Sequence, residues 1–220
     1  METSEAYRSV RGRMIDMARA ADPATPVPAC PEWTVRELLA HVTGVAADVV
    51  AGRLDGVGTQ PWVNAQLAAR STRTVEALAA EWAESGPQVD EICAALGDSI
   101  AQLVFDTVTH EQDLRQAVGE PGGRDGALDI ALRWVSEAWA AQPEADGALR
   151  LSAGATDVVL GDGPPTATLT LLPFEALRAL TGRRSLDQLR AYDWDGDPEP
   201  WLPSFTWGPF RPADSPIAEG

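Results

Sequence analysis

The stretch Thr34-Val35-Arg36-Glu37-Leu38-Leu39-Ala40-His41 marks the start of a helix on which the organisation of the N-terminal half depends. Thr34 and Glu37 have the spacing of a capping box, and Trp33 and Leu38 have the spacing of a hydrophobic staple. An apolar stripe follows and predicts a helix that ends near Gly52 and packs through Leu38, His41 or Val42, Val45 and Val49.

Three more helices are predicted around this one, over residues 3–21, from about 61 to 82, and from about 98 to 118. Prolines between residues 23 and 31 end the first helix, and Ser85-Gly86-Pro87 ends the third. Four helices with a short accessory segment are typical of a four-helix bundle.

The C-terminal half has a different pattern. Residues 126–141 predict another amphipathic helix, and after Pro143 three short strand-like runs follow, over 148–153, 156–160 and 166–172. The gap from 161 to 165 predicts a hairpin between the second and third runs. Short helices are expected at 174–180 and 185–191, before a Pro-rich aromatic tail too apolar to be free. The expected class is α+β, with a helical domain over 1–122 and a smaller α/β domain over 123–220.

Composition excludes several functions. The chain has 220 residues and a formal charge of -16, which disfavours nucleic-acid binding through a basic face. No run of uncharged residues has the length that a membrane span needs, so no membrane partner is expected. All 17 basic residues are Arg, so no Schiff-base or P-loop lysine exists. The two cysteines cannot form a disulfide scaffold, and we expect a cytoplasmic protein.

The two histidines are the residues that indicate a possible chemical function. His110 follows Asp106 by four residues on a predicted helix, so both side chains lie on one helix face. His41 lies in the apolar stripe of another helix and is expected to face the bundle interior. Two inward histidines and a carboxylate can form a three-ligand metal site with open positions, as catalytic metal sites have.

Other interpretations of these residues remain open. A histidine on an apolar face is often a hydrogen-bonded core residue, and Asp106 with His110 can be a plain ion pair. Glu111 and Asp113 are most simply solvated, with a role as hydrogen-bond partners of the histidines as the alternative. Cys30, in the loop before a helix, and Cys93, in an expected core position, are weak candidates for a nucleophile.

Two motifs resemble one known family. The stretch from Cys30-Pro31-Glu32-Trp33-Thr34 to His41 resembles the signature of mycothiol-dependent maleylpyruvate isomerase-like proteins of the DinB-like superfamily, and residues 106–115 resemble the second metal motif of that family. A weaker likeness covers 180–185 and 194–197. The Lys-free composition agrees with an actinobacterial source.

The resemblance implies a DinB-like four-helix bundle followed by a smaller α/β domain of sterol-carrier-like type. It also implies a divalent metal, usually Zn²⁺ or another transition metal such as Ni²⁺, bound by His41, Asp106 and His110. The isomerases have Glu where this chain has Asp106, which is one methylene shorter and puts the metal distance or the choice of metal in doubt.

The function implied is that of an isomerase or S-transferase in which the metal activates mycothiol, a low-molecular-weight thiol, for attack on a small electrophile. Arg183 and Arg184 are candidates for a cationic clamp on an anionic substrate or thiol, with two surface arginines as the other interpretation. A hydrolase that activates water at the same metal, or a non-enzymatic protein that binds a small ligand, are the alternatives. We expect a monomer or weak homodimer.

Overall fold

The computed structural model describes residues 1–142 and 147–218, and these form two compact units, Met1–Gly123 and Arg124–Ala218. The first unit is helical, and the second holds a four-stranded sheet with helices. The predicted α+β class is therefore confirmed. Pro143, at which we predict the change from helix to strand, lies outside the described residues.

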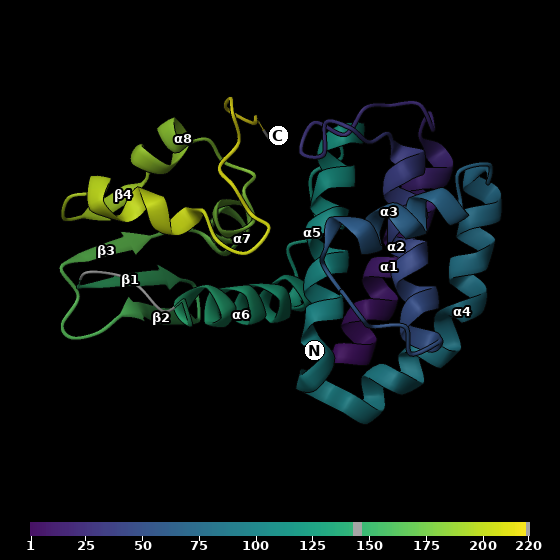
Figure 1. Cartoon of the computed structure of the whole chain (residues 1–220), viewed down its shortest axis with the longest axis horizontal. Helices are drawn as coiled ribbons and strands as arrows, with labels where there is room; N and C mark the ends of the chain where they lie inside the picture. Colours follow the sequence, from purple (N-terminus) through teal and green to yellow (C-terminus); the bar gives the residue numbers. More distant parts are fainter. Residues whose placement is uncertain (143–146, 219–220) are drawn as a thin grey trace. The chain divides into compact units, whose positions relative to one another are not determined.

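The first unit is a four-helix bundle with one accessory helix. Helices α1, α2, α4 and α5 pack against one another, and α3 packs against α2 (Figure 1). All residues of 1–123 are described, and none of them forms a strand. The elements of this unit are α1 (Thr3–Ala20), α2 (Val35–Val50), α3 (Gln60–Ala69), α4 (Val75–Leu96), the 3₁₀ helix η1 (Gly97–Ile100) and α5 (Ala101–Val118).

The bundle core is apolar apart from a few paired groups. Trp82 on α4 is fully buried and donates from Nε1 to the hydroxyl of Tyr7 on α1 at 2.8 Å. At the bundle surface, Asp90 on α4 accepts from Arg8 and Arg11 on α1. A buried polar contact inside the core and an ion-pair cluster outside it thus join the same two helices.

The single helix predicted from about 61 to 82 is wrong, because the chain breaks between α3 and α4. Ser71 donates to the carbonyl of Ala68 at the end of α3, and Thr74 accepts from the amide of Ala77 at the start of α4. Hydroxyl side chains at these positions satisfy backbone groups that a continuous helix would have paired internally.

The break predicted at Ser85-Gly86-Pro87 is also wrong, since α4 continues through Pro87 to Leu96. Trp82, Val89 and Cys93, on both sides of the proline, are buried. Gly86 admits the Arg11 guanidinium, whose atoms would lie 2.6–2.8 Å from an added Cβ. Packing of α4 on α1 therefore outweighs the cost of one proline, which removes a single helical hydrogen bond.

The second unit surrounds a mixed sheet with strand order β2-β1-β3-β4. Its alternating buried residues include Leu149, Leu151 and Leu169, and α6 packs against α7 and β2. The elements are α6 (Gly126–Ala140), β1 (Ala148–Ala153), β2 (Thr156–Gly161), β3 (Ala167–Thr170), α7 (Pro173–Leu180), α8 (Leu186–Arg190), β4 (Asp193–Asp195) and the 3₁₀ helix η2 (Glu199–Phe205).

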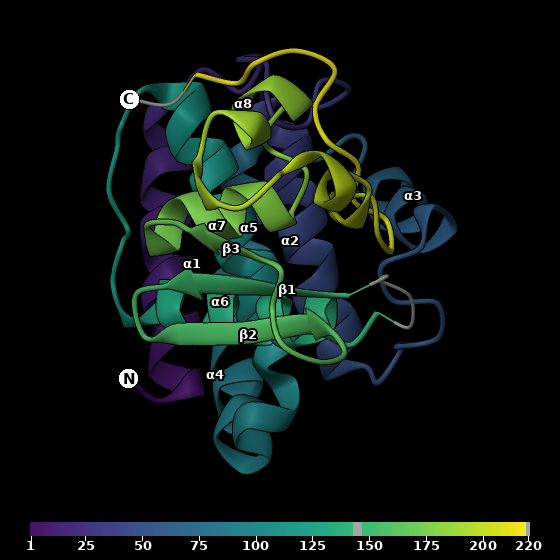
Figure 2. The same ribbon diagram turned by 90° about the vertical axis from the view of Figure 1, so that its left-hand side faces the viewer.

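The predicted hairpin between the second and third strands is wrong. The antiparallel hairpin joins β1 and β2 through Gly154, which has a φ of 64°, and Figure 2 shows these two strands side by side. β3 pairs with β1 instead, in parallel, with Leu149 opposite Ala167. The segment after Gly161 therefore crosses to the other edge of β1, a topology that the turn residues alone do not indicate.

The aromatic tail packs as expected. Trp201, Leu202 and Phe205 of η2 are buried, and Trp139 of α6 donates to the carbonyl of Ser204 at 3.0 Å. Gln188 of α8 holds the later part of the tail by accepting from the amide of Ile217 and donating to its carbonyl. The tail thus completes the core of the second unit.

Among the described residues, one helical stretch, Val75–Val118, has the length and apolar composition of a membrane span. The sequence expectation concerned an uncharged run, and this stretch contains charged residues such as Asp90 and Asp98. The stretch is divided at Gly97 into α4 and α5, and both helices pack against α1. Both helices are thus parts of the bundle, and the core helix of a bundle passes the same test of length and composition.

Candidate metal centre

The first unit brings His41, Asp106 and His110 together. His41 lies on α2, and the other two lie one turn apart on α5. Oδ1 of Asp106 is 3.7 Å from Nε2 of His41 and 3.7 Å from Nε2 of His110. Both rings are buried, and their centroids are 4.9 Å apart. Two ring nitrogens and one carboxylate oxygen thus face a common point.

Each histidine is held through its other nitrogen. Nδ1 of His41 is 2.8 Å from Oε1 of Gln66 on α3, and Nδ1 of His110 is 3.2 Å from Oδ2 of Asp113. Metal-binding histidines usually donate their second ring N–H to a carbonyl or carboxylate in this way, which leaves the first nitrogen free for the metal. The hydrogen-bond pattern therefore fits a metal site at the two Nε2 atoms.

The spacing also fits a small divalent cation. Ligands about 2.1 Å from a tetrahedral Zn²⁺ lie about 3.4 Å from one another. The two Nε2–Oδ1 distances of 3.7 Å are close to this value, and the three ligand atoms all lie within 4.8 Å of one another. Three protein ligands of this kind leave at least one coordination position for a further ligand.

A second group of ligand types overlaps the first. Cys30, His110 and Asp113 also place their ligand atoms within 4.8 Å of one another. In this group, however, Oδ2 of Asp113 contacts Nδ1 of His110 and also lies 3.6 Å from the Cys30 thiol, which donates to it. Cys30 and Asp113 thus interact with each other and with the Nδ1 side of the His110 ring. Because these contacts already use their polar atoms, His41, Asp106 and His110 are the more suitable set of metal ligands.

Two tryptophans flank the histidines. The Trp33 ring centroid is 5.1 Å from that of His41 and 5.6 Å from that of His110, and Trp62 lies edge-on to His41 at 6.4 Å. Both tryptophans are half-buried. The loop before α2 fixes Trp33, whose amide donates to the carbonyl of Cys30 at 2.8 Å. Apolar ring faces thus adjoin the polar ligand set.

The expectation that Glu111 and Asp113 are solvated is wrong, because both side chains are fully buried. Asp113 is the partner of His110, which confirms the alternative for that residue. Glu111 instead accepts from Arg13 of α1 at 2.6 Å and from Arg115 one turn along α5 at 2.8 Å. It joins α1 to the helix that carries two of the three proposed ligands.

Cys93 is buried in the bundle core, as expected. Burial, with a smaller contribution from the charge of Asp90, raises the pKa of the Cys93 thiol to about 11. A thiol that stays protonated at neutral pH is a poor nucleophile.

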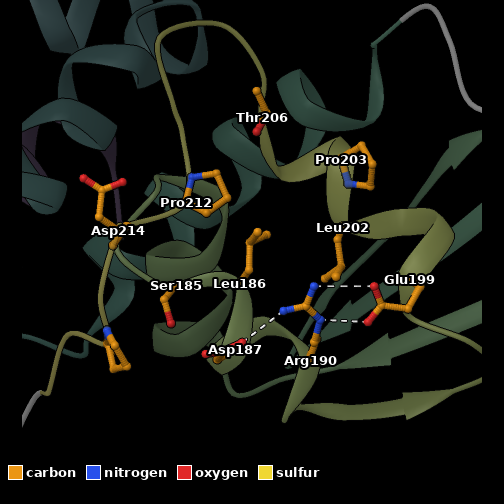
Figure 3. A pocket seen from close by; sticks show the side chains of 12 residues that line it. Ser185, Leu186, Asp187, Arg190, Glu199, Leu202, Pro203, Thr206, Pro212 and Asp214 are labelled. Carbon is orange, nitrogen blue, oxygen red and sulfur yellow. Dashed lines mark hydrogen bonds and ion pairs between the residues drawn. The ribbon is translucent and has the colours of Figure 1, made fainter.

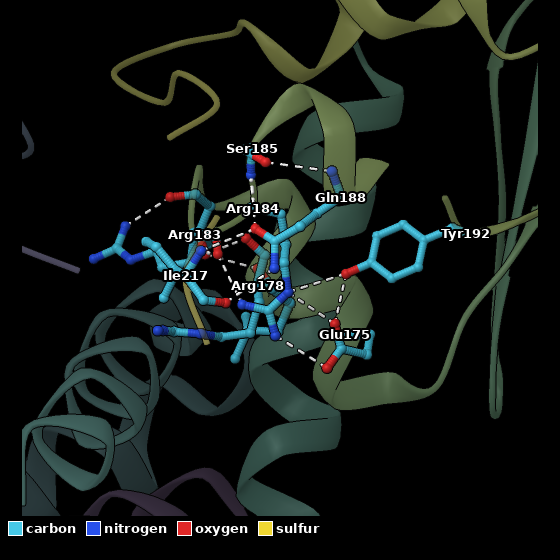
Figure 4. A network of polar contacts seen from close by, with 10 residues as sticks. Glu175, Arg178, Arg183, Arg184, Ser185, Gln188, Tyr192 and Ile217 are labelled. Carbon is cyan, nitrogen blue, oxygen red and sulfur yellow. Dashed lines mark hydrogen bonds and ion pairs between the residues drawn. The ribbon is translucent and has the colours of Figure 1, made fainter. Parts of the chain in front are cut away.

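Arg183 and Arg184 belong to the second unit. Arg184 is 3% exposed, and its guanidinium donates to both carboxylate oxygens of Glu175, to which the Tyr192 hydroxyl also donates (Figure 4). Arg183 is half-buried and donates to the carbonyl of Thr181 at 2.7 Å. The contacts of Arg184 thus stabilise its own unit, whereas Arg183 is the more accessible of the two.

The second unit also contains a cavity of about 640 Å³ beside α8 and η2 (Figure 3). Among the described residues that line it, Arg190 is the one cation, and it is paired with Glu199 at 2.7 Å and with Asp187 at 3.0 Å. The described residues that line the cavity include none of the proposed metal ligands.

Sequence reasoning missed Gln66 and Asp48. A signal was present, because Trp62 and Gln66 are four residues apart and therefore share one face of α3. Trp62 and Gln66 both contact His41 from that face of α3.

Comparisons with known proteins identify the fold and the family of this chain. Two solved structures, the mycothiol-dependent maleylpyruvate isomerase and a histidine-to-alanine mutant of it, superpose with a TM-score of 0.59 at 16% and 15% identity. Each alignment covers 82% of this chain and 88% of the other chain, so the fold is shared. A comparison with curated proteins finds no match. Residues 7–120, more than half of the chain, match the family described as the mycothiol maleylpyruvate isomerase N-terminal domain, and the chain therefore belongs to that family.

Proposed function

We propose that this protein is a metal-dependent enzyme that uses mycothiol to isomerise, or to transfer a thiol to, a small electrophilic molecule. The observation that carries the proposal is the convergence of His41, Asp106 and His110 on one point, with Nδ1 of each histidine held by a hydrogen-bond partner. Membership of the isomerase family supports mycothiol as the thiol.

The three side chains would hold a divalent cation such as Zn²⁺ or Ni²⁺. When bound, such a cation supplies a positive charge that lowers the pKa of a thiol and keeps it as a thiolate at neutral pH. Asp106 adds one negative charge to the ligand set, and the neutral histidines add none. Trp33 and Trp62 contribute apolar surface next to the ligands, which reduces the access of water.

An anionic substrate also needs a cationic partner, and we propose Arg183 for this role. Arg183 is the less buried of the two, whereas Arg184 is buried and ion-paired with Glu175 within the second unit. The role proposed for Arg184 is therefore to hold the segment that carries Arg183. Alanine at position 183 should raise the KM for an acidic substrate without changing the metal content.

The deciding experiment is an activity assay on the zinc-loaded protein with maleylpyruvate, with and without mycothiol. We expect product only when mycothiol is present, and no product from His41→Ala under the same conditions. Turnover without thiol would instead support the hydrolase. A native protein that lacks metal and binds a small ligand tightly without turnover would support the non-enzymatic alternative.

The proposal also concerns the setting of the reaction. A low-molecular-weight thiol stays reduced in the cytoplasm, so that is the compartment in which we propose the enzyme works. We propose a monomer or weak homodimer, since all three ligands come from one chain. Sedimentation of the purified protein at several concentrations tests this point.

A further inference from the structure

We propose that Gln66 is the positioning residue of His41, that Asp48 sets the direction of the hydrogen bond between them, and that Gly44 leaves the space that Gln66 occupies. This inference rests on the proposed function, because it states how the chain prepares one ligand of the metal centre before any metal binds.

The direction of the hydrogen bonds follows from Asp48. Its carboxylate accepts from the Arg53 side chain at 2.9 Å through Oδ1, and its Oδ2 lies 2.9 Å from Nε2 of Gln66. An ionised carboxylate only accepts, so Gln66 must direct its amide NH₂ group toward Asp48. The amide oxygen Oε1 then faces His41, 2.8 Å from Nδ1.

The direction of the hydrogen bonds from Asp48 through Gln66 determines the tautomer of His41. An amide oxygen only accepts, so in the neutral ring Nδ1 of His41 carries the proton and Nε2 keeps its lone pair. Nε2 is the atom that lies 3.7 Å from Oδ1 of Asp106. The protein thus presents an unprotonated nitrogen to the proposed metal position.

The burial of Gln66 supports a specific role. All residues of α3 are described, and Gln66 is the one among them that is buried. A helix that packs only for stability buries apolar side chains. Here the buried side chain is a polar amide, with one end on His41 and the other on Asp48.

Gly44 determines whether Gln66 fits. It lies on α2, one turn after His41, and a Cβ added there would lie 2.6 Å from Cβ and 2.8 Å from Cγ of Gln66. A methyl group at this position must therefore push α3 away from α2. The displacement would lengthen the Gln66–His41 hydrogen bond without removing any polar group.

The test uses the full-length, metal-free protein with ¹⁵N-labelled histidine, at a pH where imidazole is neutral. Long-range ¹H–¹⁵N spectra distinguish a ring protonated on Nδ1 from one protonated on Nε2. We expect His41 of the wild type to carry its proton on Nδ1. Gln66→Leu and Gly44→Ala should both populate the Nε2–H form, and Zn²⁺ affinity, measured against a chelator, should fall about 10–100-fold.

Two further variants show whether the effect is specific. Gly12→Ala changes a helical glycine with nothing within 4 Å of the added Cβ and should leave the tautomer and Zn²⁺ affinity unchanged. The double variant Asp48→Asn/Gln66→Glu exchanges the acid and the amide, so that residue 66 still accepts from His41 and residue 48 donates. This double variant should have His41 in the Nδ1–H form, whereas Gln66→Leu should not.

The outcomes separate this inference from the proposed function. Wild-type His41 in the Nε2–H form, or a Gln66→Leu protein that is folded and keeps both the Nδ1–H form and full Zn²⁺ affinity, overturns the role of Gln66. If wild-type His41 and the double variant both show the Nδ1–H form but the wild type binds no Zn²⁺, the hydrogen bonds from Asp48 through Gln66 to His41 are supported and the metal centre is contradicted.

Discussion

Oδ2 of Asp113 lies 3.2 Å from Nδ1 of His110, one turn along α5, and the Asp113 side chain is fully buried. A buried carboxylate at this position orients the ring and favours its Nδ1–H tautomer, as the amide of Gln66 does for His41. The two histidines are therefore held by different groups, one by a carboxyl group and one by an amide.

Replacing Asp113 by Asn should weaken Zn²⁺ binding about 10–100-fold, because the amide is a weaker acceptor than the carboxylate for the His110 N–H. Chelator competition measures the change. Glu120→Gln, which neutralises an exposed carboxylate just after α5, is the matched control and should have no effect. Equal affinities in Asp113→Asn and wild type would contradict a role for Asp113 in metal binding.

Metal binding should depend on all three proposed ligands together. His41→Ala, Asp106→Ala and His110→Ala should each lose tightly bound metal, because two remaining ligands cannot hold a divalent cation against dialysis. Elemental analysis after dialysis measures the metal, and circular dichroism checks the fold. If His41→Ala keeps a full equivalent, the proposed set of ligands is wrong.

The carboxylate of Asp106 should tolerate lengthening but not neutralisation. Asp106→Glu keeps an anionic oxygen and should retain metal, whereas Asp106→Asn keeps the shape, loses the charge and should bind metal more weakly. Isothermal titration with Zn²⁺ compares the three proteins. Wild-type affinity in Asp106→Asn would argue that this carboxylate does not touch the metal.

Glu111 should matter for stability and not as a metal ligand. Glu111→Gln leaves Arg13 and Arg115 without their common anion in a buried setting and should lower the free energy of unfolding by about 3 kcal/mol. Denaturant unfolding measures the loss, and Glu84→Gln on the exposed side of α4 is the control. If Glu111→Gln loses no more free energy of unfolding than Glu84→Gln does, the ion pairs of Glu111 contribute little to stability.

Local patterns predicted most of the helices but not the long-range contacts. The capping box at Thr34 and Glu37 marks the start of α2 correctly, since the Thr34 amide donates to Glu37 at 2.8 Å. Pro87 led to a wrong prediction of a helix end, because tertiary packing keeps α4 continuous across this residue. The β1–β3 pairing depends on contacts between strands that are not adjacent in the sequence.

For the candidate site, local patterns likewise predicted the proposed ligands but not the residues that hold them. The four-residue spacing of Asp106 and His110 placed both on one helix face, and the apolar stripe of α2 placed His41 inside the bundle. The partners of the histidines were harder to foresee. Gln66 comes from a short accessory helix, and its role depends on the absence of a side chain at Gly44, which no helical periodicity reveals.

A last prediction concerns the pH dependence of stability in the second unit. Burial acts to raise the pKa of Glu175, but the hydrogen bonds from Arg184 and Tyr192, together with nearby Arg charge, outweigh it and hold the pKa below its ordinary value of 4.5. A carboxyl whose pKa is lower in the folded state stabilises the fold above its unfolded pKa, and this stabilisation is lost as the pH falls.

Glu175→Gln should therefore lower the free energy of unfolding by about 1.5–3 kcal/mol at neutral pH, because it removes a charged hydrogen-bond partner of the buried Arg184. The difference between wild type and variant should stay constant from neutral pH to about 5 and shrink below about 4.5, as Glu175 becomes protonated in the wild type. Urea unfolding of both proteins across this range measures it. A difference that grows on acidification would have the wrong sign for a carboxylate stabilised by Arg184, and would show that burial, and not the ion pair, governs this group.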